Sequence, residues 1–110
     1  MSTSPSLPLS GKVALVTGSS RGIGAAIAKR LAKDGAAVIV HYSSSKDKAE
    51  EVAGEIRKAG GRADVAGADL SVHEGPAKLI SQLDGLFGGE FAGRLDILVN
   101  NSGTGKVSSI

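Results

Sequence analysis

Short apolar runs rich in β-branched residues recur along the chain and are separated by polar or glycine-rich stretches. Residues 12–17, 36–42 and 94–100 form such runs, and a weaker one lies near 62–66. Runs of this length without polar alternation are typical of strands that are buried on both faces. The pattern therefore predicts four strands.

Between these runs the apolar positions change to helical spacing. After residue 22 the spacing places Ile23, Ile27 and Leu31 on one helical face, which we expect to be buried. Residues 46–59 form a second predicted helix. Its inward-facing residues are expected to be Ala49, Val52, Ala53 and Ile56.

The start of a third predicted helix has two candidate signals. Ser71 and Glu74 have the spacing of a capping box, whereas Pro76 suits a first helical position. We favour a start near Gly75, because proline deep in the first turns removes a hydrogen bond. Its buried stripe is expected to be Leu79, Ile80, Leu83, Leu86 and Phe87.

The resulting order, strand and helix alternating with short connections, is typical of a parallel sheet covered on both faces. Right-handed crossovers then favour an α/β, Rossmann-type doubly wound half-sheet of about four strands in the order 3-2-1-4. We expect residues 1–10 to be a disordered lead-in and residues 11–110 to be one nucleotide-binding half-domain.

The first strand and first helix are joined by a turn that contains Gly18, Gly22 and Gly24. In this context the first glycine permits a sharp exit from the strand, the middle one lets backbone N–H groups approach a pyrophosphate, and the last allows close packing of the helix. The helix N-terminus directs free N–H groups toward the anion. The alternative is a tight corner without a ligand.

The spacing Thr17-Gly18-x-x-x-Gly22-x-Gly24, with Asp69-Leu70 after the third strand and "NNSG" from Asn100 after the fourth, resembles the short-chain dehydrogenase/reductase family. The run from Gly11 is most similar to 3-oxoacyl-carrier-protein reductases and plant aldehyde reductases. The resemblance covers residues 10–105 and implies cofactor contacts at Gly18, Ser20, Arg21, Gly22, Ile23, Gly24, Ser43, Asp69, Leu70, Asn101 and Gly103, with Ser102 replacing the usual alanine.

The expected cofactor is NADP (NADPH) rather than NAD. A site for NAD normally places an acid after the second strand, where it accepts the ribose 2′-hydroxyl, whereas an arginine suits the 2′-phosphate. Here that position reads His41-Tyr42-Ser43, without an acid, and Arg21 lies in the glycine turn. The alternative for Arg21 is a solvated loop residue.

Catalytic residues are not expected within these 110 residues. The family resemblance implies a serine and a Tyr-x-x-x-Lys in a second half of the fold. Tyr42 and Lys46 match that motif in letters but follow the second strand, at the adenosine end, so we reject them as a catalytic pair. His41 and His73 are isolated, and no metal site is expected.

Composition narrows the remaining classes. The net charge is +2 without a basic run, and the chain has three aromatic residues and no cysteine. We therefore expect no nucleic-acid binding, no disulfide and no thiolate chemistry. No apolar run approaches the roughly 20 residues of a membrane span, and the N-terminus lacks a signal-peptide pattern. A cytoplasmic location is expected, with a plastid as the alternative.

Three interpretations of function remain at this stage. The first is the cofactor-binding front of an NADP-dependent reductase that acts on a small carbonyl substrate and whose catalytic half would follow Ile110; a full-length form would be a homo-oligomer. The second is a non-catalytic product that binds nucleotide or pairs with a relative through an open sheet edge. The third is a phosphate-binding module of another doubly wound family.

Overall fold

The computed structural model describes residues 7–101, which form one α/β unit. Strands and helices alternate along most of the chain, as the sequence predicts. The elements are β1 (Val13–Val16), α1 (Gly22–Lys33), β2 (Ala37–Tyr42), α2 (Lys46–Lys58), β3 (Arg62–Gly67), α3 (Gly75–Gln82), the 3-10 segment η1 (Leu83–Gly89) and β4 (Ile97–Val99).

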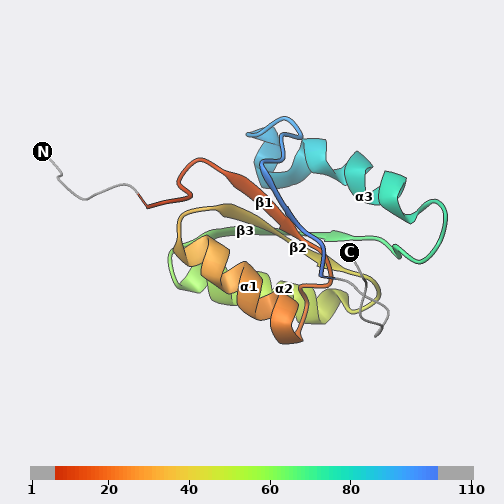
Figure 1. Ribbon diagram of the computed structural model, residues 1–110, viewed down its shortest axis with the longest axis horizontal. Coiled ribbons are helices and arrows are strands. Elements are labelled where there is room, and N and C mark those ends of the chain that lie inside the picture. The colour runs from red at the N-terminus through yellow and green to blue at the C-terminus, as the bar shows by residue number, and fades with distance from the viewer. Residues whose placement is uncertain (1–6, 102–110) are drawn as a thin grey trace, which may run out of the picture.

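The four strands form one parallel sheet in the order β3-β2-β1-β4, which confirms the predicted topology. β1 lies centrally and pairs Leu15 with Ile39 of β2 and with Leu98 of β4. Helices α1 and α2 cover one face of the sheet, and α3 covers the other (Figure 1). The carboxyl ends of all four strands consequently point to the same edge, where such sheets bind their ligands.

The buried face of α1 differs from the one predicted. Its core residues are small, namely Ala25, Ala28 and Ala32, whereas Ile23 is 74% exposed. Ile27 and Leu31 lie at the margin of the core and are only partly buried. Both the alanine face and the isoleucine-leucine face of α1 are apolar, and it is the alanine face that packs on the sheet. The smaller side chains allow the helix axis to approach the strands more closely. The four inward-facing residues predicted for α2 are all buried.

Helix α3 begins at Gly75, with Pro76 in its first turn, as predicted. Leu79 and Leu83 are buried against Leu15 and Ile39 of the sheet. The prediction is wrong for Ile80, which is 56% exposed, because it lies about 100° around the helix from Leu79.

The residues predicted to continue the buried face beyond Leu83 are less buried than expected, because the helix does not continue regularly. The backbone leaves helical geometry at Leu86, and Phe87 adopts a positive φ of 54°. The carboxylate of Asp64 accepts a hydrogen bond from the Phe87 N–H at 2.9 Å and ties this segment to β3. Leu86 and Phe87 are therefore only partly buried against the core.

Strand β4 is shorter than the predicted run 94–100. The carboxylate of Asp96 accepts a hydrogen bond from the Val13 N–H at 2.8 Å, and the Asp96 N–H donates to the Val13 carbonyl. Asp96 thus joins the amino ends of β4 and β1. Within the described residues β4 pairs only with β1, and Leu98 is 61% exposed on the face that α3 covers elsewhere.

Residues 7–10 belong to the stretch expected to be a disordered lead-in, but they form a turn on the folded unit. The Leu9 N–H donates to the carbonyl of Asp34 at 2.7 Å, and the Leu9 side chain packs against the core on the side of α1 and α2. Residues 1–6 lie outside the described part of the chain.

Candidate functional site

The glycine turn lies at the carboxyl end of β1, at the edge of the sheet where a ligand is expected. Gly18 and Gly22 have φ values of 62° and 63°, in the left-handed region that glycine adopts without steric cost. Within the described part of the chain, the N-cap residue of α1, Arg21, makes no side-chain capping hydrogen bond. The first N–H groups of α1 are therefore available to an anion.

Gly24 allows α1 to press directly onto the turn. A Cβ atom at this position would overlap the carbonyl oxygen of Gly18 and the side-chain amide nitrogen of Asn101. The glycine spacing predicts that this residue allows close packing of the helix. The structure shows that its main neighbours are the turn itself and the residue that follows β4.

Asn101 connects the end of β4 to the turn. Its backbone N–H donates to Thr17 Oγ1 at 2.8 Å, and its side-chain amide donates to the Gly18 carbonyl at 3.2 Å. The predicted residue Asn101 is therefore part of the site. Gly103, the other residue predicted for this segment, lies outside the described residues.

A hollow of about 300 Å³ opens between the glycine turn and the loop after β2. Among the described residues, its lining includes several of the predicted cofactor residues and no carboxylate. The lining residues are Gly18, Ser20, Arg21, Ser43, Ser44, Ser45 and Asn101. Arg21 is exposed, and α2 begins directly after Ser45 without a side-chain cap, so an arginine and a free helix N-terminus lie at the same hollow.

Asp69 and Leu70 lie in the loop after β3 and do not line this hollow. Asp69 Oδ1 accepts hydrogen bonds from the N–H and the hydroxyl of Ser71, at 2.9 and 2.6 Å. The Ser71 hydroxyl, followed by its N–H, lowers the pKa of the exposed Asp69 carboxyl. Ser71 thus pairs with Asp69, and no side-chain bond caps α3. Leu70 packs partly buried on the core beneath α3.

Ile23 is the predicted site residue with the most open position. It is 74% exposed, and it lies with Ala26 and Ile27 along a shallow apolar strip on the outside of α1. The structure gives Ile23 no contact to the hollow between the turn and the loop after β2.

Sequence reasoning missed two buried polar residues that organise the site, Ser19 and His41. They are 0% and 1% exposed. The Ser19 hydroxyl donates to the Val16 carbonyl at 2.6 Å and accepts from the His41 N–H at 2.9 Å. The bond to His41 joins residues 22 apart in the chain, and the only signal in the sequence was a histidine at the end of an otherwise apolar strand.

Tyr42 and Lys46 occupy positions unsuited to joint catalysis. The ring of Tyr42 fills the space above Gly67, where a Cβ atom would overlap it. Lys46 is the exposed first residue of α2. The tyrosine therefore packs toward β3.

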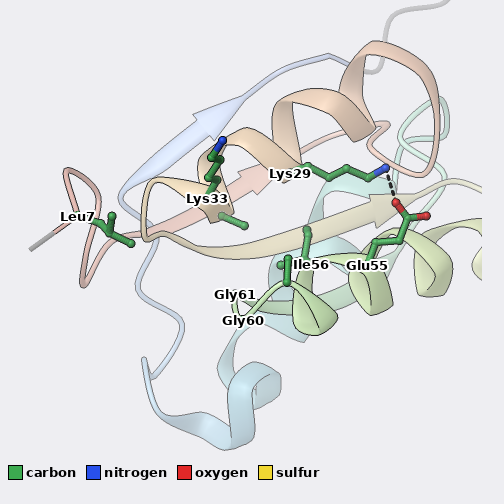
Figure 2. Close-up of a pocket in the computed structure, with 9 residues that line it drawn as sticks. Leu7, Lys29, Lys33, Glu55, Ile56, Gly60 and Gly61 are labelled. Atoms are coloured by element: carbon green, nitrogen blue, oxygen red, sulfur yellow. Dashed lines mark ion pairs between the residues drawn. The ribbon is translucent and has the colours of Figure 1, made fainter.

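A second hollow, of about 470 Å³, lies at the opposite end of the unit, beside the carboxyl ends of α1 and α2. Figure 2 shows Leu7 and Lys33 on one side and Ile56, Gly60 and Gly61 on the other. The ion pair between Lys29 and Glu55 joins the two helices beside it. This hollow is separate from the glycine turn, since α1 runs between them from Gly22 to Lys33.

The described residues contain no group of three or more His, Asp or Glu side chains arranged to hold a metal ion. Over the same stretch, residues 7–101, none of the helices has both the length and the apolar character needed to span a bilayer.

The family model for short chain dehydrogenases matches residues 12–110, which is most of the chain. This chain belongs to the short-chain dehydrogenase family. An uncharacterized oxidoreductase of Methylorubrum extorquens is 52% identical over 102 residues, which are 93% of this chain and 39% of that protein. Elsinochrome reductase 1 of Elsinoe fawcettii is 50% identical over 86% of this chain and 34% of its own length.

Solved structures agree with the family assignment. Landomycin C-6 ketoreductase LanV, determined with bound NADP and rabelomycin, is 52% identical and has a TM-score of 0.82. The match covers 86% of this chain and 39% of LanV. The chain thus spans between a third and two fifths of the length of these relatives, and it matches them across the strands and helices described above.

Proposed function

We propose that this chain is the cofactor-binding half of an oxidoreductase that transfers hydride between NADPH and a small carbonyl or alcohol substrate. The observation that carries the proposal is the hollow where the glycine turn, Arg21 and three consecutive serines meet. The reductases among its relatives support the direction of the chemistry, and LanV is a relative with bound NADP.

The residues present fit a dinucleotide. In this proposal the pyrophosphate lies against the backbone of the turn between Gly18 and Gly24, at the N-terminus of α1. There the positive end of the helix dipole and the free N–H groups favour an anion. Bound NADPH supplies the hydride. The residues of this chain hold the nucleotide and exclude water from the turn, and the adenine is proposed to lie near Asp69 and Leu70.

The hollow favours a 2′-phosphate over a free 2′-hydroxyl. Among the described residues that line the hollow there is no carboxylate to accept a hydrogen bond from a 2′-hydroxyl. A carboxylate at this place would also repel a 2′-phosphate. Arg21 offers a planar, permanently charged donor, and the serines from Ser43 to Ser45 offer hydroxyl donors. The N-terminus of α2, which starts after Ser45, adds a second helix dipole.

The test is to titrate the 110-residue chain with NADPH and with NADH by isothermal titration calorimetry. We expect NADPH to bind roughly tenfold or more tightly than NADH, because a charge-assisted hydrogen bond to phosphate contributes about 1.5–3 kcal/mol. Arg21→Ala should remove most of that preference and leave NADH binding nearly unchanged.

Arg30→Ala is the matched control. Arg30 is also an exposed arginine, but it lies near the carboxyl end of α1, where its guanidinium pairs with Asp34. Its replacement should leave both affinities as they are. Equal affinity for the two nucleotides, or a preference that survives Arg21→Ala, would contradict the assignment of NADP, and no binding of either nucleotide would contradict the proposed function.

A further inference from the structure

His41 forms two hydrogen bonds through its ring, and each reaches a different loop of the site. The Gly18 N–H donates to His41 Nδ1 at 2.8 Å. On the other side of the ring, Nε2 lies 2.8 Å from the carbonyl oxygen of Ala68, the residue before Asp69. The side chain is 1% exposed, so water cannot replace either partner.

These partners determine the protonation state of the ring. A backbone N–H can only donate, so Nδ1 must offer its lone pair to Gly18. A carbonyl can only accept, so Nε2 must carry the proton that it donates to Ala68. His41 is therefore a neutral imidazole in the Nε2–H tautomer, because a proton on Nδ1 would oppose the Gly18 N–H.

The backbone of His41 adds two bonds to the same turn. The His41 N–H donates to Ser19 Oγ at 2.9 Å, and its carbonyl accepts from the Ser19 N–H at 3.0 Å. Both backbone polar groups of Gly18 are therefore hydrogen-bonded: its N–H donates to the His41 ring, and its carbonyl accepts from the Asn101 side chain. Gly18 has a φ of 62°, and because glycine has no Cβ atom, sterics alone do not hold it at that angle, so these contacts restrict its backbone.

We propose that His41, as the neutral Nε2–H tautomer, is a positioning residue that fixes the glycine turn relative to the loop of Asp69 and so sets the distance between the pyrophosphate and adenine ends of the nucleotide site. This inference rests on the proposed function for its ligand, and on the hydrogen bonds alone for its geometry. His41 acts through Gly18 and Ala68 and does not itself line the hollow.

Two amide substitutions separate the two ring contacts. In His41→Asn the side-chain oxygen stands as many bonds from the backbone as Nδ1, so it can accept from Gly18 but cannot reach Ala68. In His41→Gln the amide nitrogen stands as many bonds away as Nε2, so it can donate to Ala68 while the Gly18 contact is lost. His41→Phe keeps a ring of similar size without either contact. His73→Asn is the control, because His73 is exposed in the loop before α3.

Three readouts test the proposal on the whole chain. Nitrogen-15 NMR of the histidine rings should show His41 protonated at Nε2 alone. Hydrogen exchange of the Gly18 amide should be slow in the wild type and in His41→Asn, and roughly tenfold faster in His41→Gln and His41→Phe. NADPH affinity should fall roughly tenfold in all three His41 variants, because each of them loses at least one of the two ring contacts, and it should change little in His73→Asn.

The outcomes distinguish this proposal from the proposed function. A His41 ring protonated at Nδ1, or Gly18 exchange that is unchanged in His41→Gln, overturns the positioning role. NADPH binding that is as tight in His41→Phe as in the wild type also overturns it, while the proposed function stands. If the wild type binds no NADPH but the tautomer and the exchange pattern are as stated, the proposed function fails and the role of His41 in fixing the turn is upheld. The NMR measurement on the wild type needs no variant to fold.

Discussion

At Gly24, space for even one methyl group is already taken by two polar groups. The carbonyl of Gly18 and the side-chain amide of Asn101 both lie where a Cβ atom would stand. The carbonyl belongs to the backbone of a turn that His41 holds through the Gly18 N–H, and the amide is hydrogen-bonded to that carbonyl. Gly22 differs, since its φ is positive but nothing lies within 4 Å of a Cβ atom there. Glycine is therefore favoured at the two positions for different physical reasons: lack of space at Gly24 and a positive φ at Gly22.

This difference predicts unequal effects of substitution. Gly24→Ala should displace α1 from the turn and weaken NADPH binding by roughly a hundredfold, since strain at such a site costs of order 1–3 kcal/mol. Gly22→Asn should cost much less, because asparagine tolerates the left-handed region. Calorimetric titration of both variants checks this, with circular dichroism to confirm folding. Similar losses for the two variants would show that steric space at Gly24 is not decisive.

At the scale of the elements, α1 shows what a hydrophobic pattern determines and what it leaves open. The strand order and the positions of α1, α2 and β2 followed from periodicity, because apolar runs and helical spacing reflect burial directly. The orientation of α1 did not follow, because its alanine stripe and its isoleucine stripe are both apolar and lie on adjacent faces. The bonds of His41 and Ser19 were also invisible, since they depend on where distant segments meet.

The alanine stripe makes the fit of α1 sensitive to volume. Ala28 is 0% exposed, whereas Ala26 on the same helix is exposed. Ala28→Leu should lower the free energy of unfolding by about 1–3 kcal/mol, because added methylenes have no space against the sheet. Ala26→Leu should change it by less than about 0.5 kcal/mol. Urea denaturation of both variants measures the difference, and equal midpoints would mean that the helix faces the sheet in another orientation.

Strands β1 and β4 are joined by a carboxylate whose charge should make stability depend on pH. The hydrogen bond from the Val13 N–H, followed by the charge of Arg94, lowers the pKa of Asp96 below its ordinary value. A lowered pKa means that the folded state favours the carboxylate. The contribution is therefore present above the ordinary pKa of about 3.9 and is lost as the pH falls through the folded value.

We expect Asp96→Asn to flatten that acid-side loss. Its amide oxygen can still accept from Val13, so the bond at neutral pH is largely retained while the titration is removed. Urea midpoints measured at several pH values from neutral to below 4 provide the test, with Asp47→Asn in α2 as a control. If the wild type and Asp96→Asn lose stability in parallel on acidification, Asp96 is not the group responsible.

At the scale of the whole molecule, the proposed function assigns nucleotide binding, and not catalysis, to the described residues. The glycine turn, the loop of residues 43–45 after β2 and Asn101 lie together at the carboxyl edge of the sheet, and together they suit a dinucleotide. The chain contains a single tyrosine, Tyr42, and its ring packs on Gly67. A reductase also needs a group that gives a proton to the carbonyl oxygen as hydride arrives, and among residues 7–101 the lining of the site includes no tyrosine.

The final prediction follows from that separation. The 110-residue chain should bind NADPH. In the presence of a reactive small ketone or quinone, the rate of NADPH oxidation, followed by its absorbance, should be the same with the protein as without it. Tyr42→Phe should leave this background rate unchanged, because the hydroxyl lies against β3 and away from the glycine turn. Turnover well above background that disappears in Tyr42→Phe would mean that Tyr42 reaches the nucleotide. Turnover that survives the substitution would place the proton donor elsewhere in the chain. Either result would contradict the proposal that this chain binds NADPH without catalysing its oxidation.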